Sequence, residues 1–273
     1  LQSVNPDIRP REHHGLPAKK KQNHTNRGSK STYRHPVPDR NALLELLLLC
    51  SGTATRRRSG CRPGRQMNSH FGSRLLDEAG DWVDQVSRKN SVSGISPTAG
   101  QMARIAGLAQ ASKIYRSQKK LQSGKWKKFS DKGNEVVFGT IGDASTSEGV
   151  FWETMNTLGV LQAPAVISVW DDGYGISVPK KFQTTKESIS EALSGMQRDQ
   201  SISGVEIIKV KGWDYEDLIA TYTRASELAR SEHVPVLIHV EELTQPLGHS
   251  SSGSHERYKS KERLEWESEY CCL

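Results

Sequence analysis

Short apolar runs alternate with amphipathic stretches between residues 97 and 240, which predicts strands alternating with helices. Two β-branched runs, Glu135–Ile141 and Ala165–Val169, predict buried strands. The stretch between them has the pattern of a capping box at Ser145 and Glu148, followed by residues at helical spacing: Phe151, Met155, Leu158 and Gln162. Because strand, helix and strand form a parallel unit, we expect both strands to end at one edge of a sheet.

The alternation continues toward the C-terminus. Helices are predicted over 97–115, 187–196 and 215–231, and strands over 205–210 and 234–240. The predicted fold class is therefore α/β, a parallel sheet with helices on both faces. About 200 residues are ample for one such domain.

Each of the first two predicted strands ends at an acidic corner. Asp143 follows the first strand, and the second ends at Trp170–Gly175, which contains Asp172. Ligands of open parallel sheets bind beyond the carboxyl ends of the strands, so the two carboxylates can converge on one cation. Mg²⁺ shared with a phosphate suits such a pair, and the free N–H groups of a following helix suit the phosphate. Either corner alone is ordinary turn chemistry, so the prediction rests on their combined spacing.

Together the two corners resemble the thiamine-diphosphate signature, and three further blocks extend the resemblance. These are Gly64–Gly72, Ser96–Gln101, and Gly248–Gly253 with Arg257 and Tyr258 beyond it. All four blocks stand in the order found in the alpha subunit, or alpha half, of 2-oxo acid dehydrogenases. The chain resembles the branched-chain type most closely, over about residues 63 to 270. The resemblance implies a thiamine-diphosphate-binding fold.

Site roles follow from the resemblance residue by residue. Mg²⁺ would be bound by the side chains of Asp143 and Asp172 and by the carbonyl of Tyr174. The cofactor would be held by Gly142, by backbone N–H groups of Ala144 and Ser145, by main-chain contacts of Ser96 and Thr98, and by Ile176 beside the thiazolium ring.

Two histidines receive roles in the same way. His249 would face the reacting carbon and assist proton movement or lipoyl acylation, and His70 would line the site. Purely structural interpretations stay open. Ser96–Thr98 is also an ordinary helix N-terminus, His70 can form a hydrogen bond within its own turn, and a lone histidine is often structural.

Two positions depart from the family pattern. Many relatives place a neutral Asn at the position of Asp172, and the branched-chain type places a phosphate-binding Arg at the position of Trp170. Two carboxylates beside a diphosphate need cations to balance them. The Trp170–Gly175 form is typical of bacterial enzymes whose alpha and beta halves are fused.

Residues 1–62 show neither strand alternation nor a clean helical period. Residues 1–65 hold 14 Lys or Arg against 4 Asp or Glu, whereas the remainder holds 24 against 27. We predict a basic, low-complexity segment over 1–62, disordered or foreign to the family, and a truncated dehydrogenase domain over 63–273. A nucleic-acid-binding arm is the lower-ranked alternative, because Tyr33 is its only aromatic residue. Leu1 in place of Met suggests a fragment.

The remaining signals concern location. The apolar run Leu43–Cys50 is short and interrupted by Glu45, so we predict neither an export signal nor a membrane span. The four cysteines show no metal-ligand or disulfide spacing, which favours the cytoplasm.

The resemblance implies oxidative decarboxylation of a branched-chain 2-oxo acid, with transfer of the acyl unit to lipoamide. It also implies partners: a beta subunit or beta half that supplies the catalytic Glu, and the lipoyl domain of an acyltransferase. The assembly would be a heterotetramer or a dimer of fused chains. We expect the isolated chain to lack turnover of 3-methyl-2-oxobutanoate. Pyruvate or acetoin as substrate, and an inactive fragment with a nucleic-acid-binding arm, remain alternatives.

Overall fold

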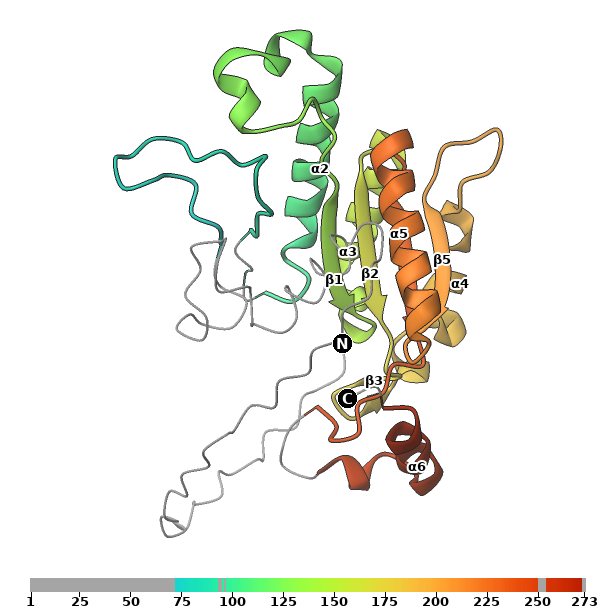
Figure 1. Ribbon diagram of the computed structural model, residues 1–273. Coiled ribbons are helices and arrows are strands. Elements are labelled where there is room, and N and C mark those ends of the chain that lie inside the picture. The colour runs from blue at the N-terminus through green and yellow to red at the C-terminus, as the bar shows by residue number, and fades with distance from the viewer. Residues whose placement is uncertain (1–71, 93–94, 96, 250–253, 272–273) are drawn as a thin grey trace, which may run out of the picture. The chain divides into compact units, whose positions relative to one another are not determined.

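The computed structural model describes residues 72–92, 95, 97–249 and 254–271 (Figure 1). All of them belong to one unit of the chain, residues 38–273. Within these described ranges, no helix has the length and apolar character needed to cross a membrane.

A four-stranded parallel sheet forms the centre of this unit. Its strands are β1 (Val137–Gly142), β2 (Ala165–Trp170), β6 (Val236–Glu241) and β5 (Glu206–Lys211), in that spatial order. Gly142 pairs with Trp170, and Trp170 pairs with Val240, so three strands end in register. The predicted parallel sheet is confirmed, with strand bounds shifted by at most two residues.

Helices cover both faces of the sheet, as predicted. Helix α3 (Gly149–Leu161) leads from β1 to β2, and α5 (Tyr215–Glu232) leads from β5 back to β6. The two crossovers step across the sheet in opposite directions. Because parallel crossovers are right-handed, they place α3 and α5 on opposite faces, as Figure 1 shows. Helix α2 (Met102–Ser117) packs against α3.

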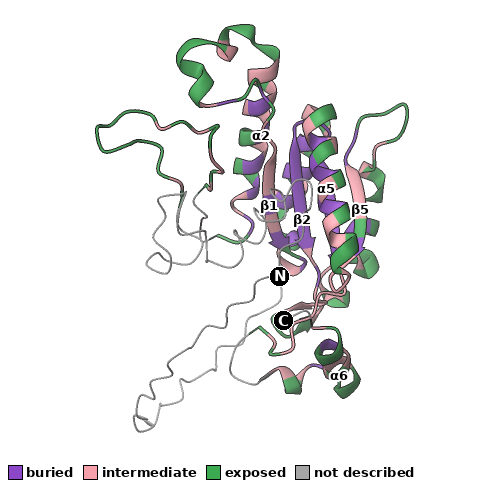
Figure 2. Cartoon of the chain, viewed as in Figure 1, coloured by how far each residue is buried: buried purple, intermediate pink, exposed green. Residues whose placement is uncertain are grey.

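The core has one apolar cluster on each face. Figure 2 shows buried residues along β2 and along the side of α5 that meets the sheet. On the α3 face the fully buried side chains include Met102, Phe151, Met155, Leu158, Ile167 and Leu237. On the α5 face they are Val166, Tyr222, Ala225, Ala229, Val236 and Ile238, among others. Burying each large side chain contributes about 1.5–3 kcal/mol, which anchors the strand ends that carry the site.

Smaller elements complete the described ranges. They are the hairpin β3 (Tyr174–Gly175) and β4 (Val178–Pro179), helix α4 (Ile189–Ala192), helix α6 (Lys261–Glu269), and 3₁₀ turns at Lys119–Gln122, Gly124–Lys128, Ala144–Ser147, Lys180–Phe182, Thr185–Glu187, Ser194–Met196 and Ser254–Arg257. The single helix predicted over 187–196 is therefore wrong in extent, since only α4 is α-helical and 3₁₀ turns flank it.

The capping box predicted at Ser145 is also wrong. Helix α3 begins after Glu148, and no side chain among the described residues caps it. The 3₁₀ turn Ala144–Ser147 comes first, because the chain closes tightly after β1: the Thr146 N–H and hydroxyl both donate to the Asp143 carbonyl, at 3.1 and 2.5 Å. The first turn after β1 is therefore this 3₁₀ turn.

Candidate cofactor and metal site

The two acidic corners lie together at the carboxyl edge of the sheet. The Asp143 N–H donates to the Trp170 carbonyl at 3.0 Å, which joins the ends of β1 and β2. The hairpin then folds back on the first corner, because a Cβ added at Gly175 would lie 2.8 Å from the Ala144 Cβ. Only glycine allows this close approach. Strand register and the glycine together bring residues 143–145 next to the second corner.

Asp143 is a buried carboxylate that forms no ion pair within the described ranges. It is 5% exposed, and its Oδ2 has no hydrogen-bond partner among the described residues. Burial, and secondarily the charges of Asp171 and Asp172, raise its pKa to about 7. A buried unpaired carboxylate oxygen is costly unless a proton or a cation meets it. The arrangement fits a hard divalent cation such as Mg²⁺, which takes oxygen ligands.

The structure distinguishes the two neighbouring aspartates of the second corner. Both oxygens of Asp171 are engaged: Oδ1 accepts from the Gly173 N–H at 2.9 Å, and Oδ2 accepts from Lys180 Nζ at 2.8 Å and His239 Nε2 at 3.0 Å. Burial tends to raise the pKa of Asp171, but these hydrogen bonds outweigh it and lower the pKa below its usual range. Asp171 is therefore a structural carboxylate.

Asp172 has the weaker internal pairing and can serve a metal. Its Oδ1 accepts from the Tyr174 N–H at 3.1 Å, and burial raises its pKa. No group of three His, Cys, Asp or Glu side chains suited to a metal occurs in the described part of the chain. Two carboxylates and a carbonyl are not such a group, yet they match Mg²⁺, which is commonly held by one or two carboxylates plus phosphate and water.

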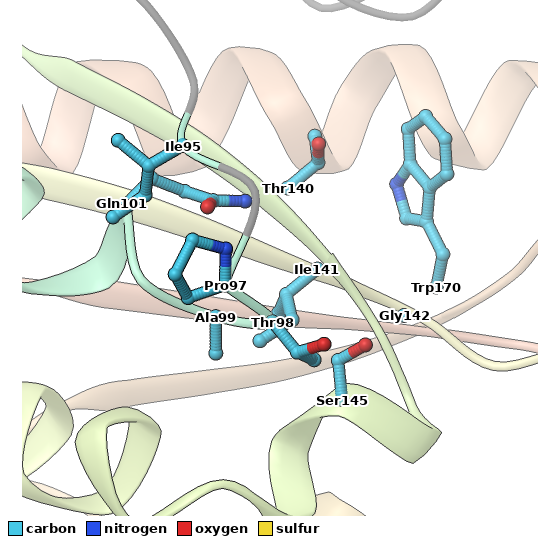
Figure 3. Close-up of a pocket in the computed structure, with 10 residues that line it drawn as sticks. All are labelled: Ile95, Pro97, Thr98, Ala99, Gln101, Thr140, Ile141, Gly142, Ser145 and Trp170. Carbon is cyan, nitrogen blue, oxygen red and sulfur yellow. The ribbon is translucent and has the colours of Figure 1, made fainter.

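A pocket of about 300 Å³ opens beside this corner (Figure 3). It joins the turn before α2 to the end of β1, and so unites two of the sequence blocks. Its lining residues are Ile95, Pro97, Thr98, Ala99, Gln101, Thr140, Ile141, Gly142, Ser145 and Trp170. Gln101 Oε1 is buried there without a partner among the described residues, and Ala99 adopts a positive φ of 57°. The pocket thus holds Thr98, Gly142 and Ser145, three predicted cofactor-binding residues.

None of the ten lining residues is charged, and Trp170 stands where the resemblance predicts a phosphate-binding Arg. Two cationic side chains, Arg263 and Lys259, instead lie at the second corner. Arg263 donates from a terminal guanidinium nitrogen to the Asp172 carbonyl at 2.9 Å, and Lys259 Nζ lies 5.4 Å from the Tyr174 ring centroid. The positive charges of both residues favour the ionised form of Asp172, opposing the effect of burial. They supply part of the charge balance that the sequence left open.

The loop that carries His249 starts and ends beside the same corner. The rings of Tyr258 and Tyr174 lie 5.5 Å apart, and a Cβ added at Gly248 would lie 2.6 Å from the Tyr258 hydroxyl. Gly248 also has a positive φ of 67°. His249 itself is exposed. The structure therefore places the base of this loop against Tyr174, while residues 250–253 lie outside the described ranges.

Two predicted site residues, Ser96 and His70, also lie outside the described residues, and their roles stay predictions. Ile176 is described: it is 63% exposed and occupies the first loop position of the β3–β4 hairpin with a φ of 59°. A β-branched residue in this left-handed conformation is strained by about 1–3 kcal/mol.

Replacing Ile176 by Gly is expected to stabilise the chain by about 1 kcal/mol, because the relief of strain exceeds the entropy that glycine adds to the unfolded chain. Urea denaturation measures the change. The matched control is Ser177→Gly, at the next loop position, which has an ordinary φ and should lose a few tenths of a kcal/mol. Equal effects of the two substitutions would show that Ile176 is not strained.

Sequence reasoning missed the polar groups that support the site: Asp171, Lys180, Ser190, His239, Lys259, Arg263 and Glu267. One signal was available, since His239 interrupts the apolar run Val234–Val240. The four-residue spacing of Lys259, Arg263 and Glu267 was a second signal, because it is the spacing of ion pairs on one helix face. Nothing in the spacing of Lys180 and Ser190 shows that the fold brings them to the site.

Comparison with known proteins decides the family. The model of the family described as dehydrogenase E1 component matches residues 63–270. The chain belongs to this family. The parallel sheet agrees with the thiamine-diphosphate-binding fold that the four blocks implied.

Similar curated proteins include alpha subunits of 2-oxoisovalerate dehydrogenase and of the pyruvate dehydrogenase E1 component. The chain is 28% identical to the mitochondrial 2-oxoisovalerate dehydrogenase subunit alpha 1 of Arabidopsis thaliana over 204 residues, which cover 74% of this chain and 35% of the relative. It is 27% identical to the 2-oxoisovalerate dehydrogenase subunit alpha of Bacillus subtilis over 203 residues, 74% of this chain and 50% of the relative. It is 31% identical to the pyruvate dehydrogenase E1 component subunit alpha of Staphylococcus epidermidis over 137 residues, which cover 49% of this chain and 35% of the relative. The chain spans a third to a half of these relatives.

Proposed function

We propose that this chain is the alpha part of a 2-oxo acid dehydrogenase that binds thiamine diphosphate through Mg²⁺. The observation that carries the proposal is the buried Oδ2 of Asp143, which has no hydrogen-bond partner in the described part of the chain and lies in an acidic corner beside the pocket. When bound, thiamine diphosphate supplies the electron sink for loss of CO₂ from a 2-oxo acid. The family match and the named relatives support this chemistry.

The chain's own residues would hold and orient this cofactor. Asp143, Asp172 and the Tyr174 carbonyl would bind Mg²⁺, and the backbone N–H groups of Ala144 and Ser145 would donate to the diphosphate. Thr98 would contact the aminopyrimidine ring, and Ile176 would lie at the thiazolium ring. His249 would hold or move a proton near the substrate carbon.

Partners and substrate belong to the same proposal. The chain would need a beta subunit or beta half that supplies the catalytic Glu, and it would pass its acyl product to a lipoyl domain. A branched-chain 2-oxo acid is the favoured substrate, supported by the names of the Arabidopsis and Bacillus relatives. Pyruvate is the second candidate, because pyruvate dehydrogenase alpha subunits also match. A cytoplasmic location stays a prediction from the cysteines.

The test measures binding of thiamine diphosphate to the full chain by calorimetry, with Mg²⁺ or with EDTA, alone and mixed with a beta subunit of the family. We expect binding that requires Mg²⁺. Asp143→Ala should weaken it by at least about 100-fold, because even supporting residues of metal sites are worth 10–100-fold. Asp172→Asn is the matched variant: it keeps an oxygen ligand and removes one negative charge, so affinity should stay within about threefold. Absence of Mg²⁺-dependent binding with a beta subunit present would refute the proposal.

A further inference from the structure

A buried chain of polar side chains runs from Ser190 in α4 over His239 in β6 to Asp171, in the turn that carries Asp172. His239 lies in β6 and is fully buried, next to the apolar residues Ile238 and Val240. Its Nδ1 lies 2.8 Å from Ser190 Oγ in α4, and its Nε2 lies 3.0 Å from Asp171 Oδ2. A histidine in the middle of an apolar strand is costly unless both ring nitrogens are satisfied, as they are here.

The pairing of Asp171 fixes the direction of these hydrogen bonds. Because Asp171 forms an ion pair with Lys180 at 2.8 Å and accepts the Gly173 N–H, it acts as an ionised acceptor. His239 must then carry a hydrogen on Nε2 and donate it to Asp171. The other ring nitrogen, Nδ1, lies 2.8 Å from the Ser190 hydroxyl oxygen, which lies 3.1 Å from Ser188 Oγ, and 3.6 Å from Glu241 Oε1. The contact with Ser190 therefore fixes the ring orientation in which Nε2 faces Asp171.

Asp171 in turn shapes the second acidic corner, Trp170–Gly175, which is the proposed metal corner. Its side chain bonds the Gly173 N–H, and its carbonyl accepts the Leu243 N–H at 3.0 Å. The Lys180 N–H donates to the Gly173 carbonyl at 2.9 Å, which closes the hairpin against the turn. Asp172 and Tyr174 are therefore positioned by a turn whose conformation depends on the orientation of one buried carboxylate.

We propose that His239 is a positioning residue for the metal corner: by donating from Nε2 to Asp171, it holds the turn that presents Asp172 and the Tyr174 carbonyl to a divalent cation and its diphosphate. The positioning of the turn stands on the geometry alone, whereas the effect on cation binding rests on the proposed function. Ligands that are oriented by supporting hydrogen bonds typically lose 10–100-fold in metal affinity when that support is removed.

Two substitutions of His239 separate the proposal from a purely structural role. His239→Gln keeps a nitrogen donor at the position of Nε2 and loses the contact with Ser190. His239→Asn keeps an acceptor at the position of Nδ1 and loses the donor to Asp171. Asn is one methylene smaller than Gln, so a purely structural role would lower the global stability of His239→Asn further, whereas loss of the donor to Asp171 would act at the turn itself.

The first measurement needs no cofactor. Amide hydrogen exchange of Gly173 in the full chain reports the turn, because its N–H is bonded to Asp171, and the amide of Ile167 in the inner strand β2 reports global stability. We expect His239→Asn to speed exchange at Gly173 at least tenfold relative to His239→Gln, beyond any difference between the two variants at Ile167. Equal exchange at Gly173 in the two variants would overturn the proposal.

The second measurement is Mn²⁺ binding in the presence of thiamine diphosphate, followed by electron paramagnetic resonance of free Mn²⁺ with the full chain and a beta subunit. We expect a loss of 10–100-fold for His239→Asn and of at most about threefold for His239→Gln. If the exchange rates differ but all three proteins bind Mn²⁺ equally, the effect on the cation is refuted. If the unsubstituted protein binds no Mn²⁺, the proposed function fails while the positioning of the turn stands.

Discussion

Asp143→Asn is expected to stabilise the metal-free chain by about 4 kcal/mol at pH 8 and hardly at all at pH 4. Burial and the neighbouring carboxylates raise the pKa of Asp143 to about 7 in the folded chain, whereas an exposed Asp titrates near 3.8. Its contribution to stability is therefore fully present below about pH 4, where both states are protonated. It is lost as the pH rises toward 7, because the unfolded chain ionises freely and the folded chain does not. Each pKa unit corresponds to about 1.4 kcal/mol, which gives the magnitude.

Urea denaturation of both proteins at pH 4, 6 and 8 in EDTA checks this expectation, and only the difference between them matters, since other carboxylates titrate in both. Mg²⁺ with thiamine diphosphate should shrink the difference at pH 8, because a cation on Oδ2 stabilises the ionised aspartate of the native protein. Asp81→Asn, at an exposed position, is the control and should show no such trend. A difference that does not change with pH would mean that Asp143 is not held in a costly ionised form.

The parallel sheet could be predicted from the sequence because its strands are continuous β-branched runs and its helices repeat apolar residues at helical spacing. For this reason the predicted bounds of β2 and α5 lie within two residues of the observed ones, Ala165–Trp170 and Tyr215–Glu232. Local turn chemistry was less predictable. Ser145 and Glu148 match the sequence pattern of a capping box, but the chain forms a 3₁₀ turn after Asp143, and this turn is closed by backbone hydrogen bonds instead of side-chain caps. Competing hydrogen bonds of similar energy decide such turns.

The acidic corners were predictable for a related reason: their position at the ends of adjacent parallel strands follows from topology. What surrounds them was not. Asp171 and Asp172 are neighbours with the same side chain, and their different environments arise from contacts with His239, Lys180 and Arg263 that span 9 to 91 residues of sequence. Such contacts depend on how separate elements pack, and single-residue patterns carry no record of that packing.

Lys259→Met is expected to cost about 3 kcal/mol of stability. Lys259 and Glu267 form an ion pair that is almost fully buried, with Nζ 2.8 and 2.7 Å from the two carboxylate oxygens. Lys259 also donates to the Gln245 carbonyl at 2.9 Å and so ties together the two ends of the loop that carries His249. Removing one partner of a buried pair typically costs 3–5 kcal/mol because it leaves an uncompensated charge. The lower end applies here, since Arg263 Nε still donates to Glu267 Oε1 at 2.8 Å.

The matched control is Lys261→Met, two residues along, whose partner Glu265 lies 3.7 Å away on the surface with both side chains exposed. A surface pair of this kind is worth less than about 0.5 kcal/mol. Urea denaturation measures both losses, and amide exchange in α6 shows whether the helix detaches first. The double substitution Lys259→Met with Glu267→Leu should recover part of the loss, because it removes the uncompensated charge together with its partner. If Lys259→Met costs no more than Lys261→Met, the buried pair does not stabilise the base of the His249 loop, and the remaining contacts there are Arg263 with the Asp172 and Leu243 carbonyls and Tyr174 with Tyr258.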